Sequence, residues 1–329
     1  MAGRSAVVFA CLAMLTVLVG FLSLRTGAVE VTWQDMLGKG DSTAVAVFQT
    51  MRVPRFVLGF LCGGALGICG AALQGLFRNP LADPTLAGVS GGAALGAVTA
   101  IVLGGALTSS PYFVPAASFL GALVAVAVVN RIAESGGRML VSTLLLGGIA
   151  INAFTGAGIG WMVYGASDSQ LRDFTFWSLG SLAGAGWTGV GVCTPLVLIS
   201  AVILALQSRS LNALALGESD AWHLGIPVED LKRSVLSSTA LAVGVVTAFT
   251  GSIGFVGLVA PHLIRLVAGA DHRVVLGGSF LLGGCLVCTA DIVARVARAP
   301  AEVPVGIVVA TVGAPFFLWL LLRDKSAVA

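Results

Sequence analysis

The chain has 329 residues, of which 57% are hydrophobic and only 10% are charged, and its formal net charge is +3. Its mean hydropathy is +1.00. A soluble domain typically carries about 25% charged residues. The composition therefore excludes an ordinary soluble protein and indicates a chain whose solvent is lipid.

Apolar runs recur along the chain, and many approach the about 20 residues that a helix needs to cross the hydrocarbon. Eight of them are separate: 6–24, 56–76, 86–107, 113–130, 139–164, 187–207, 274–294 and 303–322. The stretch 234–268 is long enough for two short crossings, and Gly251 and Ser252 offer a break. Strands of a membrane barrel alternate polar and apolar residues, and these runs do not. The sequence therefore predicts an all-α membrane protein with about ten transmembrane helices in a single permease-like domain, 1–329.

The first run could instead be a secretory signal peptide, because Arg4 gives it a positive start. The run from Ala6 to Leu24 is longer than the roughly 7–15 apolar residues of a signal peptide, and no clean cleavage site follows it. We expect a retained first helix.

Lysine and arginine predict the orientation, because they concentrate on the cytoplasmic side of a membrane. With the N-terminus inside and ten crossings, 11 of the 18 fall on the N-terminal side and seven on the other. The seven are Arg25, Lys39, Arg52, Arg55, Arg172, Arg295 and Arg298. Both termini are therefore expected in the cytoplasm.

Pairs of glycines with G-x-x-x-G spacing lie within the spans, at Gly63/Gly67, Gly88/Gly92/Gly96 and Gly156/Gly160. Small residues at this spacing let helix backbones approach closely in lipid. They predict a tightly packed bundle.

Cys285 and Cys288 form a C-x-x-C, a spacing that suggests metal or redox chemistry in a soluble protein. On a membrane helix the same spacing places two small side chains on one face. We expect no metal site here.

The stretch 165–186 is part apolar and part polar, and it is too short to cross the membrane twice. Its aromatic residues Phe174, Phe176 and Trp177 favour an interfacial or re-entrant segment.

Residues 74–96 are rich in glycine, as phosphate-binding loops are. A nucleotide site of the P-loop type needs Gly-Lys followed by Ser or Thr. Only Lys325 is followed by Ser, and it is preceded by Asp324. We therefore expect no nucleotide site and no enzymatic activity in this chain. Pro80 and Pro84 instead predict a turn at the membrane surface.

Several long motifs resemble the FecCD family, the permease subunits of ABC importers for iron chelates and cobalamin. The first is PRFVLGFLCGGALGICGAALQGLFRNPLADPTLAGVSGGAALG, 54–96, and others are LNALALGESDAWHLGIP (211–227), GSIGFVGLVAPHLIRLVAGADHR (251–273) and ADIVARVARAPAEVPVGIVVATVGAPFF (290–317). They cover nearly the whole chain in order. The resemblance implies ten helices per subunit and a homodimer with two ATP-binding subunits and one periplasmic substrate-binding protein.

The resemblance also implies site residues. In the family, the segment matching 208–233, called the coupling segment below, docks into a cleft of the ATPase. The residues that match are Leu216, Gly217, Glu218, Ala221, Leu224 and Gly225. A plain solvated loop is the alternative, although the segment has many apolar residues for one.

Arg52, Arg55 and Arg295 match arginines that meet acidic residues of the binding protein in the family. The alternative is that they anchor helix ends at the membrane interface.

Ser142 and Thr143 open the fifth span, where the family places a gate, and Asn152 lies further in. All three could equally be packing residues. No span centre carries an obvious charge except Asp291, near the outer end of the ninth span, which argues against proton-coupled transport.

Together these features predict the membrane subunit of an ATP-driven importer in a bacterial inner membrane, with ATP bound by the partner and no cofactor or nucleic acid bound by this chain. Haem is the first choice of cargo, because QLRDFTFWSLGSLAGAGW is similar to the matching segment of haem permeases. A ferric siderophore and, third, cobalamin stay open. A secondary transporter working without an ATPase is the alternative of another class.

Overall fold

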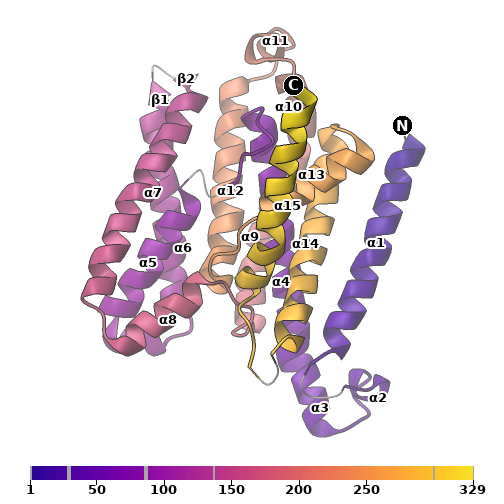
Figure 1. Cartoon of the computed structure of the whole chain (residues 1–329), viewed down its shortest axis with the longest axis vertical. Helices are drawn as coiled ribbons and strands as arrows, with labels where there is room; N and C mark the ends of the chain where they lie inside the picture. The colour runs from indigo at the N-terminus through magenta and orange to yellow at the C-terminus, as the bar shows by residue number, and fades with distance from the viewer. Residues whose placement is uncertain (1, 28–30, 85–87, 136–137, 299–300, 329) are drawn as a thin grey trace.

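The computed structural model describes residues 2–27, 31–84, 88–135, 138–298 and 301–328 (Figure 1). The elements in chain order are α1 (Ala2–Arg25), α2 (Trp33–Met36), α3 (Ser42–Val47), the π-helix η1 (Phe48–Arg52), α4 (Val53–Leu76), α5 (Val89–Leu103), the 3₁₀-helix η3 (Gly105–Ser109), α6 (Phe113–Ala133), β1 (Glu134–Ser135), β2 (Arg138–Met139), α7 (Val141–Tyr164), α8 (Asp168–Ser178), α9 (Trp187–Leu206), α10 (Ser208–Leu214), α11 (Glu218–His223), α12 (Val228–Thr250), α13 (Val256–Ala268), α14 (His272–Val296) and α15 (Val305–Val328).

The helices confirm the predicted class. Among the described residues, seven helical stretches are long and apolar enough to cross a membrane: α1, the continuous α3–η1–α4, α6, α7, α9, α12 and α14. Shorter apolar helices occupy the other predicted spans, at α5, α13 and the first part of α15. The predicted pair in 234–268 is α12 and α13, which separate at Gly251, where φ is +69°. A two-residue antiparallel ladder between β1 and β2 joins α6 to α7.

The centre of the bundle is α4, whose most extensive partner is α14. A Cβ added at Gly63 would collide with the carbonyl oxygen of Gly283, and one at Gly67 with that of Ser279. The two backbones are therefore in direct contact, which is how small residues stabilise helix pairs in lipid.

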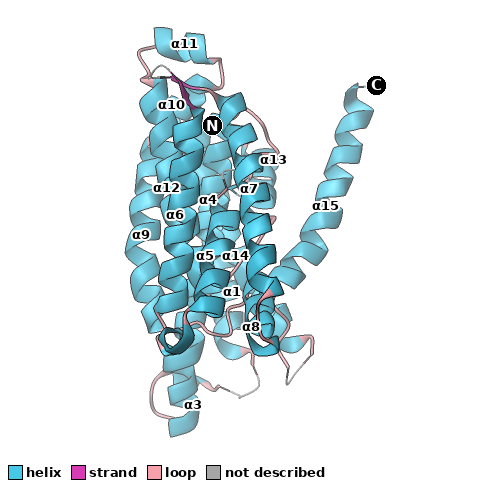
Figure 2. Cartoon of the chain, turned by 90° about the vertical axis from the view of Figure 1, so that its left-hand side faces the viewer, coloured by secondary structure: helices cyan, strands magenta, loops and turns pink. Residues whose placement is uncertain are grey.

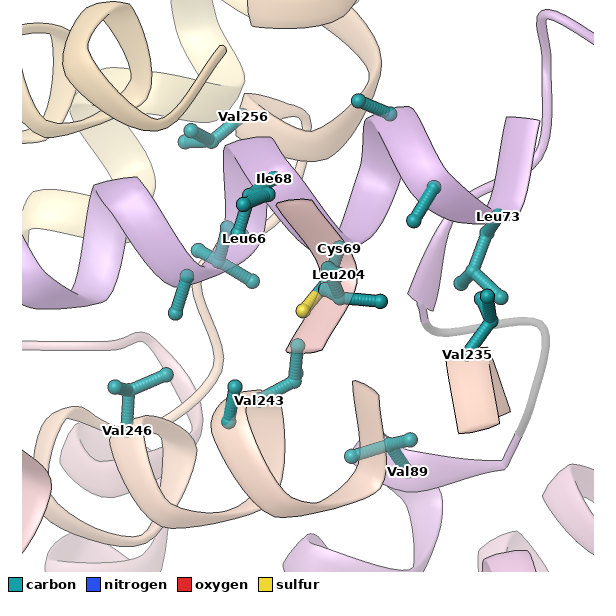
Figure 3. Close-up of a cluster of buried hydrophobic side chains, with 14 of the residues drawn as sticks. Leu66, Ile68, Cys69, Leu73, Val89, Leu204, Val235, Val243, Val246 and Val256 are labelled. Atoms are coloured by element: carbon teal, nitrogen blue, oxygen red, sulfur yellow. The ribbon is translucent and has the colours of Figure 1, made fainter. Parts of the chain in front are cut away.

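A second close pair is α5 with α6, where Gly92 lies against the backbone of Gly121 and Gly96 against that of Ala117. Between the two pairs runs α12, which contacts α4, α5, α6 and α9. Figure 3 shows the apolar core that results, where Cys69 and Leu73 of α4 meet Val235 and Val243 of α12.

The glycine pair on α7 differs. At Gly156 and Gly160 an added Cβ would meet no described atom within 4 Å. Close packing is therefore confirmed for the glycines of α4 and α5, but within this chain it is not found at the α7 pair.

The two ends of the bundle carry different elements. Both termini lie at the end that carries α10 and α11, whereas α2, α3 and α8 lie at the other (Figure 1). The predicted interfacial segment contains α8, which begins with a capping box between Ser167 and Gln170. The Gln170 side chain donates to the carbonyl oxygens of Ile101 and Val102, so α8 is held to the end of α5. Figure 2 shows α15 diverging from the bundle towards its C-terminus.

Candidate functional site

The coupling segment folds as two short helices, α10 and α11, followed by the start of α12. Two glycines mark the ends of α11: Gly217 has φ of +130° and Gly225 of +80°. These values lie in the region that favours glycine. Ala221 is fully buried and faces inwards. The predicted glycines are therefore turn residues that set the direction of α11.

Three large apolar side chains project from this end: Leu216, Trp222 and Leu224 are 66%, 68% and 62% exposed. Exposed apolar clusters of this kind mark interaction sites. Trp222, whose ring meets that of His223 edge to face at 5.1 Å, was not among the predicted residues. A tryptophan in the middle of a polar connection was the available signal for it.

The first coupling helix is hydrogen-bonded to the start of α14. The Asn212 amide donates to the Asp271 carboxylate at 2.7 Å, and its oxygen accepts the backbone N–H of His272 at 2.9 Å. The N–H of Arg273 and the Asn212 amide both donate to Asp271 and lower the pKa of its carboxyl. Hydrogen bonds thus join α10 directly to the start of α14.

The second coupling helix is tied to α12 by an ion pair. Lys232 is 2% exposed and its ammonium lies 3.0 Å from a carboxylate oxygen of Glu218, the first residue of α11. It also donates to Glu229 at 3.3 Å and to the carbonyl oxygen of Met139 at 2.8 Å. Sequence reasoning missed Lys232, because Met139 and Glu218 are 93 and 14 residues away in the chain and only Glu229 is close.

At the opposite end, Asp291 is the centre of a buried charge cluster. Its side chain is 3% exposed and accepts a hydrogen bond from Arg55 at 2.8 Å, and it forms an ion pair with Arg295, whose Nε lies 3.1 Å away. Arg55 also pairs with Glu302 at 2.9 Å. The charge of Asp291 is therefore matched by two arginines.

The third predicted arginine, Arg52, is 5% exposed and donates to the carbonyl oxygens of Leu24 and Arg25 at 2.8 and 2.7 Å. Arg295 donates to the carbonyl oxygen of Ser23 in the last turn of α1 at 3.2 Å and to that of Thr26, just after the helix, at 2.9 Å. The last carbonyls of a helix lack intrahelical partners and favour cations. These two arginines therefore cap α1.

The structure thus brings Arg52, Arg55 and Arg295 together at the predicted end of the bundle, but with most of their surface inside this chain. Their docking to a binding protein stays a prediction. Among the described residues, the exposed basic side chains at this end are instead Arg25, Lys39, Arg172 and Arg298.

The three predicted gate residues all lie on α7. Ser142 is exposed and Thr143 half-buried in the first turn, directly after β2. Asn152 is half-buried, and its side-chain oxygen lies against Gly91 of α5. Ser142 and Thr143 are therefore near the coupling end, whereas Asn152 belongs to the contact between α5 and α7.

The chain is similar to known membrane permeases over most of its length. The chain is 41% identical over 318 residues to the hemin transport system permease protein of Yersinia pestis, covering 96% of this chain and 95% of that protein. It is 44% identical over 284 residues to the cobalamin import system permease protein of Halobacterium salinarum, covering 86% and 75%.

A solved structure of a metal-chelate-type ABC transporter in an inward-facing conformation matches with a TM-score of 0.87 and 30% identity, over 97% of this chain and 99% of that one. A family model described as the FecCD transport family matches residues 15–323. The predicted resemblance is confirmed, and this chain, a multi-span membrane transport protein rather than an enzyme, belongs to the FecCD transport family.

Proposed function

We propose that the whole chain acts as the permease subunit of an ATP-driven importer in a bacterial inner membrane. It works as a homodimer, with two ATP-binding subunits on the cytoplasmic side and one substrate-binding protein on the periplasmic side. The observation that carries the proposal is the exposed apolar surface of Leu216, Trp222 and Leu224 on a segment that is otherwise firmly anchored. Water is an unfavourable environment for three such side chains, and a cleft in a partner would remove them from it.

In this proposal ATP is bound and hydrolysed by the partner subunits, and this chain receives the motion. The coupling segment reaches the bundle by two routes, from α10 to α14 through Asn212 and from α11 to α12 through Glu218. Helix α14 in turn lies against α4 through backbone contact, so it can carry a displacement along the bundle as a rigid element.

Both termini and the coupling segment face the cytoplasm in this proposal, and the arginine cluster faces the periplasm. The binding protein then docks on the surface formed around Arg52, Arg55 and Arg295. Glu302 and Arg298 are exposed neighbours of this cluster. Charges at the rim of an interface set register and association rate more than affinity.

The proposed cargo is haem, because the haem-permease relative is 41% identical over 96% of this chain, whereas a vitamin B12 permease that aligns over the same share is 39% identical. A cobalamin-permease relative has comparable identity over a shorter alignment, and the matching solved structure is of metal-chelate type, so cobalamin and ferric siderophores are the alternatives. All are large and partly apolar, which suits a bundle whose spans carry few charges.

The coupling surface is tested by co-purification of the subunit with its ATPase. Leu224→Asp puts a charge into the proposed apolar contact, and Gly217→Arg forces a long side chain into a positive-φ turn. The matched control is Leu37→Asp, which places the same charge on a leucine 70% exposed at the opposite end. We expect the ATPase to be lost with the first two variants and retained with the control. ATPase recovery equal to wild type in all three would reject the assignment.

Cargo is tested by uptake into vesicles that hold the assembled importer, with haem, a ferric siderophore and cobalamin offered in turn on their binding proteins. ATP-dependent uptake of haem alone is the expected result. Equal uptake by vesicles that contain the subunit without its ATPase would favour a secondary transporter instead.

A further inference from the structure

We propose that Lys232 is a positioning residue that joins the coupling segment to the start of α7, so that a movement of α11 changes the position of Ser142 and Thr143, the residues predicted to form a gate. This inference rests on the proposed function, since it assigns a route by which the ATPase acts on this chain. The inference is based on the buried ammonium group of Lys232, which donates hydrogen bonds to residues of three different elements.

Lys232 lies in the second turn of α12 and is almost entirely buried. An ammonium has three N–H donors, and here each has an acceptor. The acceptors are Glu218 of α11 at 3.0 Å, Glu229 of α12 at 3.3 Å and the carbonyl oxygen of Met139 in β2 at 2.8 Å. A buried charge is stable only while such partners stay in place, so the three elements are held together as a group.

In the β1–β2 hairpin, two side chains of α12 hold the peptide group of Met139 on both sides. Its carbonyl oxygen accepts from Lys232, and its N–H donates to Glu229 at 2.6 Å. The ladder of β1 and β2 has only two residue pairs, too few to be stable by itself. The position of this hairpin therefore depends on α12. Leu140 follows directly as the N-cap of α7, and Ser142 and Thr143 lie in the first turn.

The coupling arm is the Glu218 carboxylate at the first residue of α11. Its side chain is 45% exposed, so it can leave Lys232 without being stranded away from water. Helix α11 contacts α10 and α12 and carries the exposed Trp222. A partner that displaces α11 therefore pulls on Lys232 and, through it, on Met139.

The neighbouring ion pair provides a contrast. Arg233 and Glu134 also join α12 to the hairpin, at 2.6 Å, but their side chains are 48% and 42% exposed. Solvated pairs of this kind contribute little. Arg233 is thus a matched control on the same helix, one position away, that touches the same hairpin.

The test uses the importer assembled with its ATPase and binding protein in vesicles, with haem as the probe cargo and cobalamin where haem is not taken up. Uptake and ATP hydrolysis are measured together and expressed as cargo per ATP. Lys232→Met removes the ammonium and keeps the stem. We expect it to lower cargo per ATP by at least about fivefold, a typical lower value for coupling between sites. Lys232→Arg should keep most of the ratio, and Arg233→Met should leave it unchanged.

A second variant guards against a folding defect at Lys232. Glu218→Ala removes only the coupling arm, and Lys232 keeps Glu229 and the Met139 carbonyl, so its charge stays paired. It should lower cargo per ATP to a similar extent, and the double variant with Lys232→Met should lower it no further.

A wild-type ratio in Lys232→Met or in Glu218→Ala would overturn this role of Lys232, and so would an equal loss in Arg233→Met. If neither variant assembles while Arg233→Met does, Lys232 is a folding residue and the proposal is also overturned. A wild-type complex that takes up no cargo would instead reject the proposed function itself, so the two failures are distinguishable.

Discussion

Helices α4 and α7 have the same length, 24 residues, and both carry glycines at G-x-x-x-G spacing, yet they occupy opposite environments. Among the seven long spans, the one that contains α4 is the most buried and α7 is the least. Gly63 and Gly67 touch the backbone of α14, whereas Gly156 and Gly160 face open space within the described chain.

The difference shows that the bundle has a closely packed axis, formed by α4 and the helices around it, and an exposed flank, formed by α7. Helix α4 is enclosed by α14, α12, α13 and α9, and its N-terminal end is held to Asp291 through Arg55. Helix α7 rests on α5 and α6 and exposes large side chains such as Phe154, Trp161 and Tyr164. In the proposed importer the axis transmits force, and the flank is the surface available to lipid, a second copy or cargo.

The largest effect is expected where the axis is pinned. Asp291→Asn removes the charge shared by two largely buried arginines, and breaking a buried ion pair typically costs about 3–5 kcal/mol. The control is Glu302→Gln, which removes the other partner of Arg55 but is 39% exposed and should cost about 1 kcal/mol or less. Thermal unfolding of the purified protein in detergent measures both. Equal losses would mean that burial does not distinguish the two carboxylates.

A smaller effect is expected from the glycines themselves. Gly63→Ala forces a methyl group into the carbonyl of Gly283, and overpacking of this kind typically costs about 1–3 kcal/mol. Gly156→Ala has room for its methyl group and should be neutral or slightly stabilising, because alanine favours helix over glycine. The same unfolding assay compares them. A loss in Gly156→Ala as large as that in Gly63→Ala would show that the flank is packed as tightly as the axis.

The smallest effect is expected on the flank. Trp161 is 76% exposed, and substitutions at such sites usually change the free energy of unfolding by less than about 0.5 kcal/mol. Trp161→Ala should therefore leave the unfolding of the detergent-purified subunit nearly unchanged. A destabilisation of several kcal/mol would contradict the contrast, because it would require Trp161 to be buried.

Much of the fold could be predicted from apolar runs, since a helix that crosses lipid must satisfy its backbone within the segment and be apolar along its length. The break at Gly251 could also be predicted. The extent of α5 was overestimated, because the run 86–107 is apolar beyond the helix, which ends at Leu103. The short helices α2 and α3 were missed within a connection that has no long apolar run to mark them.

The candidate site was predictable where the signal was local. The coupling segment stands out as an apolar stretch between spans, and Gly217 and Gly225 mark its turns. The distant partners of its polar side chains were not predictable. Lys232 of α12 contacts Met139 in the β1–β2 hairpin, and Asn212 of α10 contacts Asp271 at the start of α14.

The sequence by itself determined that the chain is a membrane bundle, where its spans lie and that it resembles the FecCD family, because each of these depends on the residues within a run or motif. Only the tertiary structure decided which glycines allow backbone contact, since that requires knowing which helix lies opposite. It also decided that Arg52 and Arg295 cap α1 and that Arg55 and Arg295 neutralise Asp291. The sequence alone does not show whether an arginine donates to water, to a partner protein or to a carbonyl oxygen at the end of another helix.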